Sequence, residues 1–463
     1  MGESPEAVFD RLVSAGPPER PEPLFGTACV LGGSIAGLLA ARVLAGHAER
    51  VVIIERDAIE GETRPRPGVP HGPQMHLLLQ GGLRWMERWF PGFTRETQDG
   101  GAILARPDQI ERYTDGQKQA SGASRHVILQ ASRAYLEAHI RAGVLALPNV
   151  SVLRSQVTGL DIQGDAVRGV RHRHGDTTEL LPADMVVDAM GRSSRLADWV
   201  SEDGFDRPGL ERLPTVINYA TALFKRPPQA AEEMAHLYAV SRYNPPYGPD
   251  SIAVAGVIAT ENDRWTMVLM TYGHARPGQT VDAFRATCAK LPSPLFAEAA
   301  SQGLAEEIAT YHQGDTRRRD FTGLRHFPAR LVSMGDAVAS FSPIYGQGIS
   351  SAALHASCLS EYLSGRPDLD LPAARFFELQ RVVVDAAWAV SAEVDAARLD
   401  ALSGASVPEE VSRKRQAMGQ IARASLVDAY VGSRFLDVAV MLAHPSTLAD
   451  PALLERAIAV NQG

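Results

Sequence analysis

Glycines at a fixed spacing near the N-terminus could bind a phosphate group. The turn Gly32–Gly37 has glycine at its first and last positions, and Ser34 replaces the middle glycine of the G-x-G-x-x-G pattern. Gly32 permits a tight turn, and Gly37 permits a helix to pack closely on the preceding strand. The Ser34 hydroxyl could donate a hydrogen bond to a pyrophosphate at the positive end of the following helix.

A carboxylate after the next apolar run indicates that this phosphate belongs to a nucleotide. Thr27–Leu31 and Val51–Ile54 are typical of short buried strands, with an Ala/Leu-rich helix between them. Glu55 follows the second strand, about 20 residues beyond Gly32, where a carboxylate accepts hydrogen bonds from a ribose 2′-OH and repels the 2′-phosphate of NADP. The alternative is a tight β–α turn that binds no ligand.

A second candidate region lies far downstream. A short apolar strand ends in Gly335-Asp336, which places a carboxylate where the hydroxyls of a nucleotide sugar could reach it. The loop Ser342–Ile349 follows with a Pro-x-x-Gly-x-Gly pattern and opens a helix, so its backbone N–H groups could face an anion or a carbonyl. The alternative is a helix-capping loop with a surface aspartate.

The histidines do not form a recognisable metal or catalytic site. His172 and His174 alternate on a predicted strand without an acidic or thiol partner at ligand spacing, so we expect a solvated face. His71 and His76 are separated by a helix break and do not have the spacing of a zinc pair, although they could line a ligand pocket. We predict no metal and name no catalytic acid or base.

Composition favours a water-soluble, cytoplasmic globular protein. The chain has 463 residues, more than one core supports, so two or more packed units are expected. The formal net charge is −8 and the basic residues form no cluster, which argues against a nucleic-acid partner. The apolar runs are too short to cross a membrane, and no secretory signal is evident. Three isolated thiols offer neither a disulfide framework nor a zinc site: Cys29, Cys288 and Cys358.

Between the glycine turn and the downstream loop, segments with helical periodicity alternate with segments with strand periodicity. Leu77–Phe90 and Ser132–Val144 predict helices, the second capped by Ser132. Trp85 and Trp89 lie one helical turn apart and are expected to pack in the core. Residues 150–190 predict a small antiparallel meander that ends in a buried strand.

These patterns predict an α/β fold. A three-layer, Rossmann-like nucleotide domain is interleaved with a mainly antiparallel β domain that binds the substrate, and a helical region follows. The expected bounds are 1–24 for a mobile, proline-rich N-terminal segment, 25–105, 125–200 and 320–372 for the nucleotide domain, 106–124 and 201–319 for the substrate domain, and 373–463 for the helical C-terminal region.

Four segments together carry a family resemblance. They are Val30–Gly37, Glu55–Asp57, Val187–Ser194 and Met334–Ala337. In order and separation they resemble the p-hydroxybenzoate hydroxylase class of single-component flavin monooxygenases across nearly the whole chain. The resemblance implies FAD, bound without a covalent link.

Two further segments resemble a subgroup of that class. Tyr219–Lys225 and Phe341–Gly348 are similar to the bacterial flavin epoxidases of polyether antibiotic pathways, of the monensin and lasalocid type. Those relatives commonly carry Gln-Ala-Arg-His-Ala-His where this chain has His71–His76. This departure concerns the substrate rather than the cofactor. The Trp-x-Trp-x-Ile-Pro segment of the halogenase branch is absent from this sequence, which disfavours halogenation.

The resemblance assigns the FAD contacts residue by residue. The contacts to the adenosine and diphosphate half would be Gly32, Ser34, Ile35, Ala36 and Gly37 in the turn, Glu55 and Arg56 at the ribose, Arg66 and Arg133 at the phosphates, and Val157 beside the adenine. The contacts to the flavin half would be Asp336 at the ribityl or pyrophosphate groups, and Gly346, Gln347, Gly348 and Ile349 at the isoalloxazine edge. For Arg66 and Arg133 the alternative is a solvated guanidinium on the surface.

The resemblance also implies the chemistry. NAD(P)H or a partner flavin reductase would reduce FAD, and O₂ as co-substrate would then give a C4a-hydroperoxide that epoxidises an alkene. The alternatives are hydroxylation of an aromatic or other secondary metabolite, reduction or dehydrogenation of a prenyl-type substrate, and a non-redox cyclase in which FAD shapes the pocket. NAD(P)H consumption coupled to oxygen uptake separates the first two alternatives from the non-redox cyclase.

The expected substrate is a large apolar polyene or polyketide-like natural product. It would bind between the FAD domain and the strands of residues 210–275. The runs Val216–Phe224 and Ile252–Thr260 present no paired arginines that could clamp a small carboxylate. The arginine-rich run Thr316–Asp320 lies outside them and is expected to face solvent. No membrane partner is expected, and the oligomeric state stays open.

Overall fold

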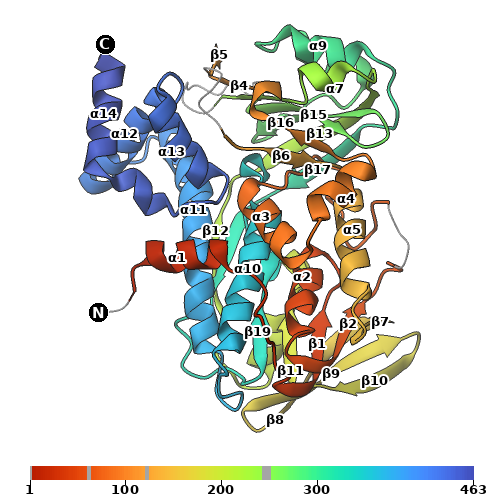
Figure 1. Cartoon of the computed structure of the whole chain (residues 1–463). Helices are drawn as coiled ribbons and strands as arrows, with labels where there is room; N and C mark the ends of the chain where they lie inside the picture. Colours follow the sequence, from red (N-terminus) through yellow and green to blue (C-terminus); the bar gives the residue numbers. More distant parts are fainter. Residues whose placement is uncertain (1–2, 60–63, 120–124, 242–251, 463) are drawn as a thin grey trace.

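Five parallel strands form the centre of the half that carries the glycine turn. The computed structural model describes residues 3–59, 64–119, 125–241 and 252–462. The strand order is β19-β11-β1-β2-β7 (Figure 1). The strands are β1 (Phe25–Leu31), β2 (Ala48–Glu55), β7 (Val150–Arg154), β11 (Met185–Asp188) and β19 (Leu331–Ser333). Because all five are parallel, their carboxyl ends meet at one edge, where ligands bind in folds of this type.

Helices cover this sheet and carry its main core. The helix α2 (Ile35–Leu44) starts directly after β1, and α10 (Gly348–Ser364) packs against it. Both are buried along most of their length, because Ala, Leu and Ser let the helices approach closely. The other helices of this half are α3 (Gln80–Trp89), α4 (Phe93–Asp99), α5 (Arg133–Leu145) and α6 (Leu196–Glu202).

A seven-stranded sheet forms the second half. Its order is β17-β13-β16-β15-β14-β4-β5, and every neighbouring pair is antiparallel except β14 and β4. The strands are β4 (Ile110–Thr114), β5 (Gln117–Lys118), β13 (Ile217–Lys225), β14 (His236–Val240), β15 (Val254–Thr260), β16 (Arg264–Tyr272) and β17 (Ala309–Gln313). One face is covered by α7 (Ala230–Glu233), α8 (Val281–Cys288) and α9 (Pro294–Ser301), as the upper part of Figure 1 shows.

Three small sheets and the C-terminal helices complete the fold. The small sheets are β8 (Gln156–Gln163) with β9 (Ala166–His174) and β10 (Thr177–Pro182), β12 (Gly209–Leu213) with β18 (Thr316–Asp320) and β20 (Ala339–Ser340), and β3 (Ile103–Ala105) with β6 (Ile128–Gln130). The C-terminal helices are α11 (Ala374–Ser403), α12 (Glu409–Ala424), α13 (Ala429–Ala439) and α14 (Pro451–Gln462). Within the described residues, no helix is long and apolar enough to cross a membrane.

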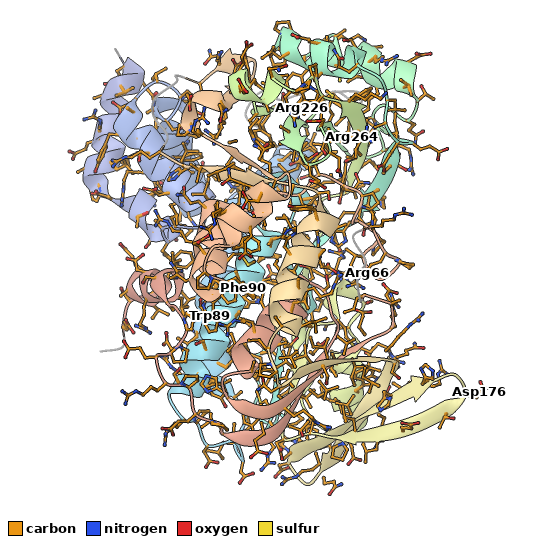
Figure 2. All side chains as sticks on the ribbon, turned by 45° about the vertical axis from the view of Figure 1, so that its right-hand side comes forward. Arg66, Trp89, Phe90, Asp176, Arg226 and Arg264 are labelled. Atoms are coloured by element: carbon orange, nitrogen blue, oxygen red, sulfur yellow. The ribbon has the colours of Figure 1, made fainter. Side chains whose placement is uncertain are left out.

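Several predictions of local structure are confirmed. Ser132 caps α5 by accepting a hydrogen bond from the backbone N–H of Tyr135. Trp85 and Trp89 are buried and stacked, with ring centroids 5.0 Å apart. Asp176 lies at the exposed tip of the β9–β10 hairpin (Figure 2), as its turn sequence predicts.

The prediction of a mobile segment over residues 1–24 is wrong for its first half. Pro5–Ser14 form the helix α1, capped by Ser4. Its apolar stripe is buried against the core: Val8, Phe9, Leu12 and Val13. The prolines that suggested an extended lead-in follow this helix, where they end it. The predicted meander is confirmed for β8, β9 and β10, and the buried strand predicted at its end is β11. Its start needs correction, because β7 belongs to the parallel sheet.

Gly37 gives a direct test of how closely α2 packs on β1. A Cβ at this position would collide with the backbone carbonyl oxygen of Gly32. We expect Gly37→Ala to lower the free energy of unfolding by on the order of 1–3 kcal/mol or more, because backbone cannot move aside as a side chain can. Thermal unfolding of Gly37→Ala and Gly209→Ala measures the effect. Gly209 in β12 has open space around its Cβ, so equal melting temperatures for the two variants would refute this account.

Candidate functional site

A cavity of about 650 Å³ lies between the carboxyl edge of the parallel sheet and the seven-stranded sheet. The predicted site residues are far apart in sequence, yet all except Gly37 line this cavity. They are Gly32, Ser34, Ile35, Ala36, Glu55, Arg56, Arg66, Arg133, Val157, Asp336, Gly346, Gln347, Gly348 and Ile349. Gly37 lies behind the wall, where it allows the close packing of α2.

The β1–α2 turn is closed by backbone and by a carboxylate. Gly32 adopts a φ of 102°, which favours glycine, and its N–H donates to the carbonyl of Ile54. The Glu55 carboxylate accepts a hydrogen bond of 2.9 Å from the N–H of Gly33 and one of 3.0 Å from the N–H of Asp57. Glu55 therefore fixes the turn and the end of β2 at the same time.

A buried cluster of charges surrounds the N-terminus of α2. Glu137 on α5 pairs with Arg133 at 2.8 Å, Arg66 at 2.9 Å and Arg141 at 3.3 Å. Burial alone would raise the pKa of the Glu137 carboxyl, but Arg133 and Arg66 outweigh burial and hold this pKa below its usual value. The alternative of solvated surface guanidinium groups is wrong for Arg66 and Arg133, because both are buried.

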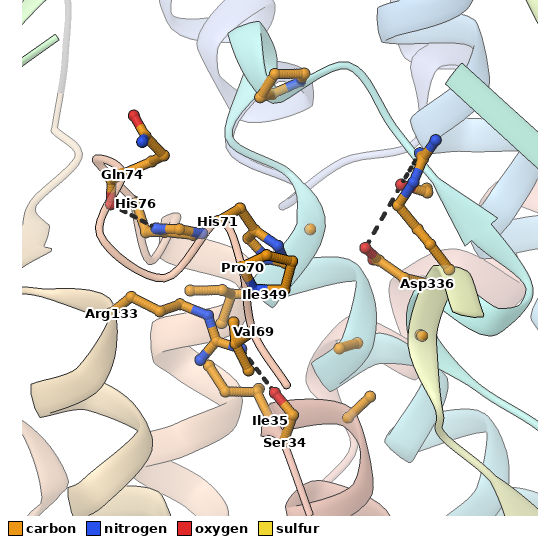
Figure 3. A pocket seen from close by; sticks show the side chains of 18 of the residues that line it. Ser34, Ile35, Val69, Pro70, His71, Gln74, His76, Arg133, Asp336 and Ile349 are labelled. Carbon is orange, nitrogen blue, oxygen red and sulfur yellow. Dashed lines mark hydrogen bonds between the residues drawn. The ribbon is translucent and has the colours of Figure 1, made fainter. Parts of the chain in front are cut away.

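Ser34 connects this cluster to the cavity. Its hydroxyl accepts a hydrogen bond of 2.8 Å from Arg133 and donates one of 3.1 Å to Glu137. Figure 3 shows the bond between Ser34 and Arg133 on one side of the cavity, with Asp336 on the other. The two charged sides therefore face each other across the space that a ligand would occupy.

Asp336 lies three residues beyond the end of the strand β19 and lines the cavity. Burial raises the pKa of its carboxyl, while Arg192 and Arg133 act in the opposite direction. The preceding Gly335 donates its backbone N–H to Nδ1 of His355 at 3.0 Å. His355 on α10 is fully buried, and burial lowers its pKa to about 3, so the ring is a neutral acceptor that fixes this strand end. The local sequence of α10 does not predict this contact between His355 and Gly335, so His355 was not among the expected site residues.

The loop before α10 forms another part of the cavity wall. Gly346 adopts a φ of 64°, and Gly348 opens the helix with no atom near its Cβ position. The Tyr238 hydroxyl donates a hydrogen bond of 3.0 Å to the carbonyl of Ile344, which ties the loop to the seven-stranded sheet. The buried amide of Gln347 has no hydrogen-bond partner within the described part of the chain.

Two histidines and two tyrosines form an aromatic corner of the cavity. The ring centroids of His71 lie 5.4 Å from His76 and 6.0 Å from Tyr311, and those of Tyr219 and Tyr311 lie 5.4 Å apart. Burial, with help from Arg133, lowers the pKa of His71 to about 4, so this ring is neutral at pH 7. The expectation that both histidines could line a pocket is confirmed. Tyr311 was missed, because only the pairing of β17 with β13 places it there.

Two expectations about solvent exposure need correction. His172 is buried, and its Nδ1 lies 3.0 Å from the Ser155 hydroxyl. Arg317 in β18 is mostly buried, and it binds Asp315 at 2.8 Å. Asp315 also binds Arg192 of the cavity wall, so part of the arginine-rich run supports the site.

The two ends of the cavity differ in the groups that they offer to a ligand. One end of the cavity offers a helix N-terminus, carboxylates and arginines, which suit the ribose and diphosphate of a dinucleotide. The other end is formed by the seven-stranded sheet and is mainly apolar and aromatic. Among the described residues, no three acidic, histidine or cysteine side chains are grouped to hold a metal ion.

Comparison with known proteins agrees with this geometry. Protein Rv3254 of Mycobacterium tuberculosis (strain ATCC 25618 / H37Rv) is 31% identical over 353 residues, which cover 73% of each chain. The flavin-dependent brominase Bmp2 superposes with a TM-score of 0.64 at 14% identity, covering 95% of this chain and 99% of that one. PqsL of Pseudomonas aeruginosa in complex with 2-aminobenzoylacetate superposes with a TM-score of 0.62 at 19% identity, covering 81% of this chain and 96% of that one.

A further solved structure and a family match complete the comparison. A mutant of 2-methyl-3-hydroxypyridine-5-carboxylic acid oxygenase gives a TM-score of 0.60 at 18% identity, covering 81% of this chain and 92% of that one. At such identities the solved structures show the fold alone. Residues 26–365 match the family described as "FAD binding domain". The chain therefore belongs to the FAD-binding-domain family.

Proposed function

We propose that this protein epoxidises one or more alkenes of a large, apolar polyene or polyketide natural product. The observation that carries the proposal is the composition of the cavity wall formed by the seven-stranded sheet. Its aliphatic members are Leu237, Val254, Ile258, Val268 and Met270. No lysine or arginine of the described part of that sheet lines the cavity. Such a wall suits an extended apolar chain better than a small aromatic acid.

Unpaired polar atoms on the opposite side fit FAD. The amide of Gln347, Nη2 of Arg66 and the hydroxyl of Ser342 are buried without a hydrogen-bond partner among the described residues. Buried polar groups are seldom left unsatisfied, so their number here favours a ligand with many polar atoms. The cavity also has the glycine turn and helix N-terminus that a diphosphate needs.

Each part of the FAD would then have a partner on this chain. Glu55 would accept the ribose hydroxyls, and Ser34 with Arg133 would hold the diphosphate at the N-terminus of α2. Asp336 would bind the ribityl or diphosphate groups, and Gln347–Ile349 would contact the isoalloxazine edge. Bound FAD, once reduced by NAD(P)H or a partner reductase, would supply the activation of O₂.

The residues at the sheet end would position the alkene and exclude water. The Tyr238 hydroxyl donates a hydrogen bond to the carbonyl of Ile344, which links the loop that would face the isoalloxazine edge to the sheet. The apolar wall desolvates the substrate and orients it without forming a bond to it. The similarity of Tyr219–Lys225 and Phe341–Gly348 to polyether-pathway epoxidases supports the same assignment.

Hydroxylation of an aromatic metabolite is the second candidate. The aromatic corner favours it, because the neutral His71 ring and the hydroxyls of Tyr219 and Tyr311 could hydrogen-bond a phenol. Reduction of a prenyl chain and cyclisation without redox chemistry have no specific structural support.

Purified protein is expected to be yellow and to release FAD when it is denatured. The three cysteines are buried away from the cavity lining, so no thiol is available to form a covalent link. Absorbance spectra before and after precipitation with acid measure the release. A flavin that stays on the polypeptide would refute non-covalent binding, and a protein that takes up no FAD would refute the proposed function.

Asp336→Ala is expected to weaken FAD binding by roughly ten- to hundredfold. A charge-assisted hydrogen bond to a buried hydroxyl contributes about 1.5–3 kcal/mol. Titration of the apoprotein with FAD, followed by quenching of flavin fluorescence, gives the dissociation constants. Asp165→Ala is the matched control, because Asp165 is an exposed aspartate that lies outside the cavity. Equal constants for the two variants would show that Asp336 does not bind the cofactor.

Incubation with an apolar polyene, NAD(P)H with a flavin reductase, and O₂ is expected to add oxygen atoms to the polyene. Mass spectrometry of the product detects each added oxygen, and cleavage of the product with aqueous acid to a diol identifies an epoxide. Oxygen uptake with a phenol but not with a polyene would favour the aromatic hydroxylase. An altered polyene without added oxygen would favour reduction or cyclisation.

A further inference from the structure

Arg112 is a half-buried cation with no acidic partner among the described residues. It lies at the middle of β4, and burial lowers the pKa of its guanidinium to about 10. The guanidinium makes no hydrogen bond or ion pair with any residue that the structure describes. By contrast, the neighbouring Glu111 pairs with Lys118 at 2.8 Å on the same hairpin. A half-buried guanidinium without an acidic partner has its N–H donors available to bind an anion.

The register of the sheet places Arg112 in line with the cavity. Arg112 is paired with Tyr238, Tyr238 with Gly256, and Gly256 with Val268. Directly paired residues project from the same face of a sheet, and Tyr238, Gly256 and Val268 line the cavity. Neighbouring strands lie about 4.8 Å apart, so Arg112 lies one strand, or about 5 Å, beyond the last lining residue of this row.

His236 supplies a second donor beside Arg112. Its Nδ1 lies 3.1 Å from the amide nitrogen of Gln130, which can only donate. Burial, with Arg112 adding to it, lowers the pKa of His236 to about 3. The neutral ring therefore carries its proton on Nε2, and His236 lines the cavity two residues before Tyr238. An arginine and an N–H donor on one sheet face suit an oxygen anion.

The surroundings of Arg112 add positive rather than negative charge. The ring of His126 is close enough to be influenced by Arg112 and also by the exposed Arg84 and Arg125. The Nε2 atom of His126 lies 3.1 Å from the carboxylate of Asp437. The positive potential is therefore not cancelled by the described side chains around it, and it would attract an anion from the cavity.

We propose that Arg112 and His236 form an anion-binding subsite for a carboxylate at the end of the substrate that lies away from the cofactor loop. This inference rests on the proposed function and adds to it the chemical class of the substrate: an apolar chain with a terminal acid. Tyr238 lies between the two ends, because its strand adjoins Arg112 and its hydroxyl bonds Ile344 of the loop. The carboxylate would fix how far the chain extends toward the flavin.

Binding of paired probes to the oxidised, FAD-loaded protein tests the subsite without requiring turnover. The probes are farnesoate and farnesol, which have the same polyene chain and differ in the terminal group. Isothermal titration is expected to show at least tenfold tighter binding of farnesoate to the wild type. Arg112→Met is expected to remove this preference and leave the affinity for farnesol unchanged, and Arg112→Lys to retain part of it.

The controls separate a binding role from a structural one. Arg106→Gln removes an exposed arginine shortly before β4 and is expected to change neither affinity. The melting temperature of Arg112→Met should not fall below that of the wild type, because the variant removes an uncompensated charge. The inference is overturned if wild type does not bind farnesoate, if Arg112→Met keeps the preference, or if inorganic phosphate alone competes as well as farnesoate does. Farnesoate that binds but is not oxidised would refute epoxidation of this chain and leave the subsite intact.

Discussion

The buried carboxylate of Glu137 is the contact on which the nucleotide end of the site depends. A carboxylate removed from water is stable only if it is paired, and three arginines from two segments of the chain pair with it. Arg66 comes from the loop after β2, whereas Arg133 and Arg141 come from α5 itself. This one charge therefore fixes the loop against α5, and through Ser34 it fixes α5 against the glycine turn.

Charge balance in this cluster explains how it can accept a diphosphate. The carboxylates of Glu55, Asp57 and Glu137 are matched by three guanidinium groups, and Arg66 contacts all three acids. The cluster is therefore close to neutral before any ligand binds. The additional attraction for phosphate must come from directed donors, namely the N-terminus of α2 and guanidinium N–H groups that face the cavity. The directions of these donors, rather than the net charge of the cluster, make this end of the cavity selective for a diphosphate.

The sequence predicted those parts of the site that depend on short-range patterns. The glycine turn follows β1 directly, Glu55 ends β2, and Asp336 lies three residues beyond β19, so local periodicity locates them. Tyr311, His355 and Arg112 carry no such signal, because their roles arise from pairings between distant segments. The helix α1 was missed because the prolines after it dominated the composition of its region. The family was recognised from the order of motifs, whereas the substrate depends on side chains that vary within one fold.

The parallel pairing of β4 with β14 has a consequence for how the chain folds. β4 belongs to the first third of the sequence, yet within the described residues it pairs with its hairpin partner β5 and with a strand more than a hundred residues later. Closing so long a loop costs chain entropy that is recovered only when both strands are present. During synthesis the seven-stranded sheet therefore cannot be completed before β14 has left the ribosome. Until that moment β4 is an exposed edge, and Arg112 is a charge on it that discourages pairing with another chain.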